Sequence, residues 1–353
     1  MTSSDATRLP QFCWFFEALN FDDGNRHSGL ASRCLSALRR SQPVRHGDRA
    51  LDGQAAAAVL VRTGNFQRRS DDTGARSGTR ACLHLQHMRR HQRFNEIRTM
   101  CQLLGMNCNT PTDVTFSFTG FAQRGGRTDH HADGWGIAFF EGAGLRHFVD
   151  HQPACDSPVA QLIRNYPIKS RNVIAHIRKA TQGEVALENC HPFVRELWGR
   201  YWVFAHNGDL KDFQPRLHAS FRPVGSTDSE RAFCWLMQEL WKSHAGIPSV
   251  EELTLTLREL TPQIARHGPF NFMLSNGHAL WAHCSTNLFF VERRHPFANA
   301  QLADEDVSID FARNTTPRDK VAVVVTAPLT TNESWVQFQP GELRVFVEGE
   351  AVA

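Results

Sequence analysis

One cysteine, Cys101, stands where it can supply two of the groups that attack on an amide requires. A thiolate is the nucleophilic form of cysteine, so such a site needs a base and also fixed donors for the oxyanion that forms. A free α-amine on the same residue titrates close to neutral pH and can serve as the base, whereas an acylated nitrogen cannot. Cys101 follows Met100, so a chain that starts at Met100 and loses its initiator methionine begins at the cysteine.

Four downstream residues are of the types that would bind an α-amino acid with a side-chain amide. Arg178 follows an apolar segment, and a guanidinium donates two parallel hydrogen bonds to a carboxylate. Asp228 can cap a helix and bind an ammonium group. Asn207 and Gly208 offer a side-chain amide and a backbone N–H to an oxyanion. Singly, these residues have ordinary explanations, namely an ion pair, a helix cap and an Asn-Gly turn, but together they describe a receptor for glutamine.

The elements that must position these residues predict an α+β fold. Segments 173–177 and 201–205 have the composition of buried strands, and each delivers polar residues at its carboxyl end. Strands are also predicted at 272–274 and 279–282, on either side of an Asn-Gly hairpin turn, and at 321–325 and 343–347. Three helices are predicted, each with an apolar face. The first begins at Ser157-Pro158, and its apolar face contains Val159, Leu162, Ile163 and Tyr166. The second follows Thr227-Asp228 and contains Phe233, Leu236, Met237 and Leu240, and the third follows Ser249 and contains Leu253, Leu257, Leu260 and Ile264. Helices segregated from strand clusters indicate helices that cover packed sheets.

Composition changes abruptly near residue 100. Residues 1–100 contain 16 arginines, no lysine and nine acidic residues, so 23 of the 39 basic and 27 of the 36 acidic side chains lie downstream. We therefore expect an N-terminal extension, residues 1–99, and one domain, residues 101–353. Three interpretations of the extension stay open: a start assigned too far upstream, a cleaved propeptide, or a disordered basic arm that binds an acidic partner such as nucleic acid.

The domain itself is mildly acidic, which argues against a nucleic-acid or anionic membrane partner for it. No apolar run is long enough to cross a bilayer, and no secretory signal pattern is present. Nine cysteines without a CxxC pair favour a reducing compartment, so the expected location is the cytoplasm. The histidines at 130, 131, 176, 191 and 206 lack zinc-type spacing, and we interpret them as hydrogen-bonded or surface side chains.

The chain from 101 to 353 resembles the class II glutamine amidotransferases, and within them the small stand-alone YafJ-type proteins. The resemblance is carried by residues 101–106 (Cys-Gln-Leu-Leu-Gly-Met), 133–136 (Asp-Gly-Trp-Gly), 188–193 (Glu-Asn-Cys-His-Pro-Phe), 206–208 (His-Asn-Gly), 227–230 (Thr-Asp-Ser-Glu) and 326–335. It implies a four-layer αββα N-terminal nucleophile hydrolase fold. It also implies Cys101 as nucleophile, Asn207 and Gly208 as oxyanion hole, and Arg178, Asp228 and Thr181 as glutamine-binding residues. Gln182 stands where many members carry histidine, and we assign it no role.

The implied reaction is glutamine hydrolysis through a γ-glutamyl thioester, and it needs no metal or organic cofactor. The ammonia is either released or passed to a separate synthase partner, because the resemblance uses all of the chain after Cys101. Two alternatives stay open. One is an amidohydrolase for γ-glutamyl conjugates, like those of the ergothioneine pathway, and the other is a glutamine sensor in which Cys101 stays acylated.

Overall fold

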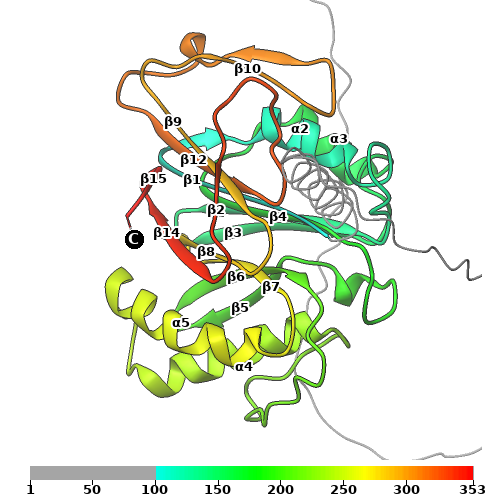
Figure 1. Ribbon diagram of the computed structural model, residues 1–353, viewed down its shortest axis with the longest axis vertical. Helices are drawn as coiled ribbons and strands as arrows, with labels where there is room; N and C mark the ends of the chain where they lie inside the picture. The colour runs from blue at the N-terminus through cyan, green and yellow to red at the C-terminus, as the bar shows by residue number, and fades with distance from the viewer. Residues whose placement is uncertain (1–100, 353) are drawn as a thin grey trace, which may run out of the picture. The chain divides into compact units, whose positions relative to one another are not determined.

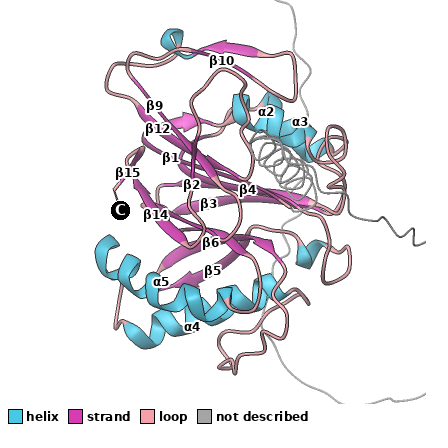
Figure 2. Ribbon diagram, viewed as in Figure 1, coloured by secondary structure: helices cyan, strands magenta, loops and turns pink. Residues whose placement is uncertain are grey.

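The computed structural model describes residues 101–352 of the chain. The predictions for residues 1–99 therefore fall outside the described residues. Within 101–352, two antiparallel sheets stack face to face, and helices cover both outer faces (Figures 1 and 2).

The first sheet contains seven strands in the order β13-β9-β12-β1-β4-β2-β3, so that β1 lies at its centre. The strands are β1 (Gln102–Asp113), β2 (Trp135–Glu141), β3 (Gly144–Asp150), β4 (Lys169–Ile177), β9 (Phe289–Arg294), β12 (Lys320–Val325) and β13 (Val336–Gln337). In the register of β1 with β4, Gln102 lies opposite Ile177. Cys101, which precedes β1, and Arg178, which follows β4, therefore lie at the same end of two neighbouring strands.

The second sheet contains six strands in the order β15-β14-β8-β7-β6-β5. The strands are β5 (Phe193–Leu197), β6 (Arg200–Gly208), β7 (Phe270–Ser275), β8 (Ala279–Cys284), β14 (Glu342–Val347) and β15 (Glu350–Ala351). β5 pairs with β6 only from Arg200 to Phe204, while β7 continues to Gly208. One edge of β6 is therefore not covered by β5 at its carboxyl end. A separate small ribbon joins β10 (Asn299–Gln301) to β11 (Ser308–Asp310), and two short 3₁₀ helices span η1 (Leu187–Asn189) and η2 (Phe311–Arg313).

Alternation of side chains along the strands produces three apolar layers. In β4, Val173 and Ala175 pack toward α2 (Thr115–Gln123) and α3 (Pro158–Asn165), whereas Ile174 packs between the sheets. In β6, Ala205 packs between the sheets, whereas Phe204 packs toward α4 (Asp228–Ser243) and α5 (Val250–Ala265). Three core layers separate four layers of elements, which confirms the predicted αββα fold (Figure 2).

Two predicted helices form as their sequences indicate. The Thr227 hydroxyl, and not the Asp228 carboxylate that the sequence suggested, caps α4 by accepting a hydrogen bond from the Glu230 N–H at 3.2 Å. α5 begins with a complete capping box between Ser249 and Glu252. The predicted apolar residues of both helices are buried against the second sheet, namely Phe233, Leu236, Met237, Leu240, Leu253, Leu257, Leu260 and Ile264.

The predicted apolar face of α3 is wrong in part. Ser157 caps this helix and Pro158 begins it, as predicted, but Leu162 and Tyr166 are each 57% exposed. The buried residues are Ala160 and Ile163, so the short helix contacts the sheet through a narrower stripe. Helix α2 is not predicted by the sequence, because its nine residues include two threonines, three phenylalanines and one glycine; packing of Phe118 and Phe121 against the first sheet overrides that weak propensity.

Candidate active site

Cys101 immediately precedes the central strand β1. Its side chain contacts the backbone of Lys179, in the segment that follows β4. Its Sγ lies 3.2 Å from both the N–H and the carbonyl oxygen of Lys179, and the residue is only 9% exposed. Burial raises the pKa of the thiol to about 11, although the Lys179 N–H and the Arg178 charge act in the opposite direction. At neutral pH the side chain is therefore a thiol, and nucleophilic attack requires a base that removes its proton.

Asn207 connects the nucleophile to the second sheet. Its Nδ2 donates a hydrogen bond to the carbonyl oxygen of Cys101 and lies 3.4 Å from the hydroxyl of Thr326. That hydroxyl in turn accepts from the Leu103 N–H at 2.9 Å. The carboxyl end of β6 is thereby fastened to the amino end of β1, with an amide donor beside the reactive residue.

The N–H of Gly208 is not used by the neighbouring strand β7. Gly208 lies opposite Phe270, but the N–H of Phe270 donates to Ser285 Oγ at 3.0 Å and its carbonyl oxygen accepts from His283 Nδ1 at 2.6 Å. The polar groups of Phe270 therefore face β8, and Gly208 and Phe270 form a non-hydrogen-bonded pair of the antiparallel ladder. The Gly208 N–H points to the opposite edge of β6, which β5 does not cover.

Only glycine fits at position 208. A Cβ built on it would lie 1.8 Å from the Pro269 carbonyl oxygen and 2.5 Å from His206 Nε2. The close approach brings the backbone of β6 against Pro269 and leaves the N–H at the uncovered edge. Asn207 and Gly208 thus present one side-chain donor and one main-chain donor, the pair that the sequence predicted for an oxyanion.

Arg178 is 2% exposed and makes no ion pair with any Asp or Glu among residues 101–352. Its guanidinium instead donates to four carbonyl oxygens, of Gln182 at 3.0 Å, Glu184 at 3.1 Å, Gly183 at 3.3 Å and Asp133 at 3.4 Å. The neutral acceptors hold the side chain and shape the 182–184 loop around it, yet they leave its charge uncompensated. A buried guanidinium of this kind favours binding of an anion.

Asp228 is the first residue of α4 and is 6% exposed. Its Oδ2 accepts from the Leu210 N–H at 2.8 Å, and no Lys or Arg within residues 101–352 pairs with it. The Asp228 carboxylate raises the pKa of the Cys101 thiol while the Arg178 guanidinium lowers it, so both charges act on that sulfur. Two buried side chains of opposite charge therefore act on one thiol.

The Asp-Gly-Trp-Gly motif supports the Arg178 loop rather than adding a reactive group. Asp133 Oδ2 accepts from the Ala180 N–H at 2.8 Å, and the Gly134 carbonyl accepts from the Arg178 N–H at 2.8 Å. Gly134 has a φ of +112°, and a Cβ there would lie 2.6 Å from Cys190 Sγ. Trp135 is fully buried in the layer beneath α2 and α3.

The loop after Arg178 contains one predicted site residue and one residue whose role the sequence did not indicate. Thr181 is exposed and lies three residues beyond Arg178. Gln182 Nε2 donates to Asp209 Oδ1 and lies 3.4 Å from the Leu210 carbonyl oxygen, which joins this loop to the segment that follows Gly208. Asn189 connects the same loop to the segment before α4. Its Nδ2 donates to the Glu184 carbonyl oxygen at 3.0 Å, and its Oδ1 accepts from the Ser226 N–H at 2.9 Å. Asn189 lies within the 188–193 motif, but the motif alone does not indicate this bridging role.

The histidines near the site are mostly buried. Burial lowers the pKa of His206, whose ring nitrogens lie 2.8 Å from Ser229 Oγ and 3.1 Å from the Pro269 carbonyl oxygen, as a hydrogen-bonded side chain should. The interpretation is wrong for His191, which is 4% exposed and has no hydrogen-bond partner for either ring nitrogen among residues 101–352. His191 instead packs against His176, with ring centroids 4.2 Å apart.

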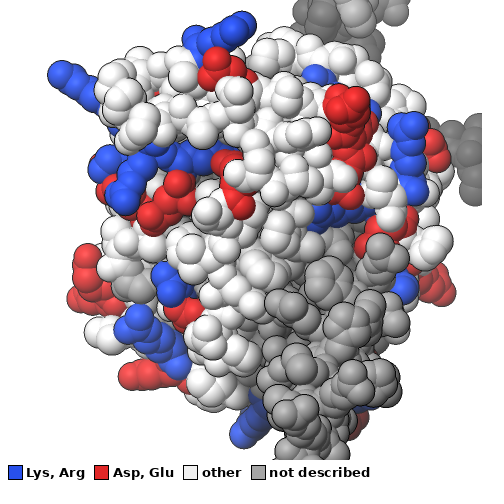
Figure 3. Space-filling view, turned by 45° about the horizontal axis from the view of Figure 1, so that its top comes forward, with Lys and Arg blue, Asp and Glu red and all other residues white. Residues whose placement is uncertain are grey.

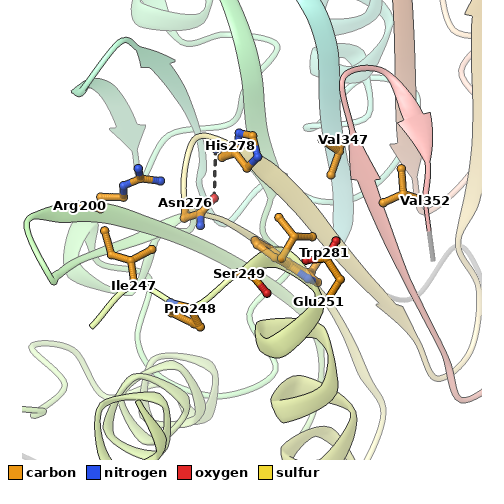
Figure 4. Close-up of a pocket in the computed structure, with 11 residues that line it drawn as sticks. Arg200, Ile247, Pro248, Ser249, Glu251, Asn276, His278, Trp281, Val347 and Val352 are labelled. Carbon is orange, nitrogen blue, oxygen red and sulfur yellow. Dashed lines mark hydrogen bonds between the residues drawn. The ribbon is translucent and has the colours of Figure 1, made fainter. Parts of the chain in front are cut away.

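A separate cavity of about 490 Å³ lies at the other end of the second sheet (Figure 4). Its lining includes Arg200, Asn276, Trp281 and the first residues of α5. Arg200 begins β6 and Gly208 ends it, so the two ends are about 26 Å apart at roughly 3.3 Å per residue. This cavity is therefore distinct from the site around Cys101.

The face of the molecule drawn in Figure 3 mixes charges of both signs. On the face drawn in Figure 3, Lys and Arg side chains lie next to Asp and Glu side chains, without a stripe of one sign. No helix within residues 101–352 combines the length and apolar character needed to span a membrane.

Comparison with known proteins gives a consistent result. The family model for class-II glutamine amidotransferases matches residues 100–353. The chain is 53% identical over 254 residues to the Escherichia coli protein named "Putative glutamine amidotransferase YafJ", covering 72% of this chain and 100% of that protein. It is 54% identical over 257 residues to the Haemophilus influenzae protein named "Putative glutamine amidotransferase", covering 73% of this chain and 87% of the relative.

A solved structure supports the same assignment. The crystal structure of a predicted glutamine amidotransferase from Pseudomonas aeruginosa aligns with a TM-score of 0.59 and 44% identity, over 72% of this chain and 100% of that one. With the fold, these matches show that the chain belongs to the class II glutamine amidotransferases.

Proposed function

We propose that residues 101–353 form a glutaminase domain in which Cys101, as the first residue of the active chain, attacks the side-chain carboxamide of glutamine. The thiol proton passes to the α-amine of Cys101 as sulfur bonds to the amide carbon. The oxyanion is stabilised by Asn207 Nδ2 and the Gly208 N–H. The C–N bond then breaks, the α-amine returns the proton to the leaving nitrogen, and ammonia leaves. Water resolves the γ-glutamyl thioester to glutamate and the free thiol.

Substrate binding in this proposal uses the two uncompensated charges. The Arg178 guanidinium binds the α-carboxylate, and the Asp228 carboxylate binds the α-ammonium group. Thr181, on the exposed loop beyond Arg178, contacts the bound glutamine. None of these steps requires a metal or an organic cofactor.

One observation carries the proposal. The Cys101 thiol lies within the electrostatic influence of a buried unpaired cation and a buried unpaired anion, and its own carbonyl group is bonded to the Asn207 amide. The family of the chain supports glutamine as the ligand with this combination of charges and a carboxamide.

The active form is proposed to begin at Cys101. The high pKa of the buried thiol requires a base, and the α-amine of Cys101 fills that role only when it is not acylated. The match to the family begins at residue 100, and all of the Escherichia coli relative aligns within 254 residues of this chain.

Two competing functions are separated by one set of assays. The chain beginning at Cys101 is incubated with glutamine, with γ-glutamyl conjugates of small amines, and with asparagine as the shorter control. Preferred release of ammonia from glutamine supports the proposal, and preferred cleavage of a conjugate supports the alternative amidohydrolase. Binding of glutamine without turnover, measured by calorimetry together with intact mass, supports the sensor.

The acceptor and the location are part of the same proposal. We expect the protein to act in the cytoplasm, since the cysteines of the described residues have free thiols. They are Cys101, Cys108, Cys155, Cys190, Cys234 and Cys284. A separate ammonia-accepting synthase is the proposed partner. Co-purification from the native source followed by mass spectrometry tests for it, and recovery of the amidotransferase chain alone supports simple release of ammonia.

A further inference from the structure

Asn271 lies directly opposite Asn207 in the register of β7 with β6, and its side chain is fully buried. No sequence pattern indicates a role for this residue. The structure nevertheless joins its side chain to the backbone of the proposed oxyanion hole, so its role depends on the proposed function.

All the hydrogen-bonding capacity of the Asn271 side chain is used. Nδ2 donates to the Asn207 carbonyl oxygen at 3.0 Å and to Thr286 Oγ1 at 2.8 Å. Oδ1 accepts from the N–H groups of Ser285 at 2.9 Å and Thr286 at 3.0 Å. The turn after β8 therefore fixes the amide on one side, and the amide fixes the Asn207 carbonyl on the other.

The bond from the Asn271 side chain to the Asn207 carbonyl also helps to hold the direction of the Gly208 N–H. The two groups belong to one planar trans peptide unit, in which C=O and N–H point in opposite directions. Because Gly208 and Phe270 form a non-hydrogen-bonded pair, Asn207 and Asn271 form the adjacent hydrogen-bonded pair, whose main chain turns the Asn207 carbonyl toward β7. The Asn271 side chain adds a second donor to that carbonyl at 3.0 Å, which holds the Gly208 N–H toward the edge of β6 that β5 does not cover. Donation to the carbonyl also polarises the same peptide and strengthens its N–H as a donor.

We propose that Asn271 is a positioning residue that aims the Gly208 N–H at the oxyanion formed when Cys101 attacks its substrate. Asn271 does not touch substrate. It supplies the fixed orientation that an oxyanion donor needs, because a misplacement of about 1 Å can lower the rate as much as about 100-fold. Its loss should therefore reduce kcat more than it weakens substrate binding, since Arg178 and Asp228 are untouched.

The test compares Asn271→Asp with Thr286→Val in the chain that begins at Cys101. Aspartate keeps the acceptor for Ser285 and Thr286 but removes the donor to Asn207. Valine at 286 removes one partner of the same amide and leaves the bond to Asn207. We expect Asn271→Asp to lower kcat for glutamine at least about tenfold with KM within about threefold of the parent, and Thr286→Val to stay within about threefold for both constants. Alkylation of Cys101 by iodoacetamide should be unchanged, because the thiol and its surroundings are preserved.

Two further measurements separate this inference from the proposed function. Asn271→Ala is a neutral second variant in case the buried carboxylate prevents folding, and it should show the same loss of kcat. Crystal structures of the parent and a folded variant show whether the 207–208 peptide has turned. If the parent does not hydrolyse glutamine, the proposed function fails, while a turned peptide in the variant still upholds the positioning role. A folded Asn271 variant with parental kcat, or with an unmoved peptide, overturns it.

Discussion

Replacing Asn207 with aspartate removes one donor from the proposed oxyanion hole while keeping the size of the side chain. Asn207 is fully buried, and its Nδ2 donates to the Cys101 carbonyl oxygen. Loss of one oxyanion donor typically lowers kcat by about 10² to 10³, which corresponds to about 2.7–4 kcal/mol of transition-state stabilisation. We expect a loss in that range for Asn207→Asp, with little change in KM because the charged groups that bind glutamine remain.

The expected loss must be distinguished from partial unfolding. Removing the donor leaves the Cys101 carbonyl without that bond, at a cost of about 1–3 kcal/mol in the free energy of unfolding. Thr326→Val is the matched control, because it removes the hydroxyl that contacts both Asn207 Nδ2 and the Leu103 N–H but keeps the Asn207 donor. Steady-state ammonia release and urea unfolding are measured on both variants. A folded Asn207→Asp protein with kcat within about threefold of the parent would refute the oxyanion-hole assignment.

Three further predictions concern the nucleophile and the carboxylate-binding residue. Cys101→Ala should abolish glutamine hydrolysis while thermal unfolding stays close to that of the parent, and residual turnover at the parental rate in an ammonia assay would exclude Cys101 as nucleophile. Arg178→Lys should raise KM for glutamine about 10- to 100-fold, because a point charge replaces a planar fork whose charged hydrogen bonds contribute about 1.5–3 kcal/mol each; an unchanged KM would remove Arg178 from the binding site. Burial holds the pKa of the Cys101 thiol at about 11, so in the full chain its alkylation by iodoacetamide should rise about tenfold per pH unit between about pH 7 and 9, and a plateau in that range, measured by peptide mass spectrometry, would contradict the burial argument.

The sequence predicted those parts of the fold in which local signals and tertiary packing agree. The capping box at Ser249 and the apolar residues of both helices located α4 and α5 correctly, but the cap offered at Asp228 is wrong, because Thr227 caps α4 and Asp228 is its first residue. The Asn-Gly signal located the β7–β8 hairpin, where Gly277 has a φ of +84°. Helix α2 was missed because its stability comes from packing of Phe118 and Phe121, which no local propensity records.

The candidate site was predictable where a residue type alone suggests its chemistry. Cys101, Arg178 and Asp228 carry thiol or charge, and the structure places both charges where they act on the thiol. Asn271 and Gln182 were not predictable, because their importance arises from contacts with the Asn207 carbonyl and with Asp209 across strands and loops. The partnerless ring nitrogens of His191 likewise follow from packing between elements and not from sequence spacing.

The identity of the first residue in the active polypeptide tests the central claim most directly. Protein purified from its native source is separated by intact mass, and each form is assayed for ammonia release from glutamine. The account predicts that turnover belongs to the polypeptide whose first residue is Cys101, with its α-amine free. Equal turnover by a polypeptide in which the Cys101 nitrogen is still acylated would contradict it.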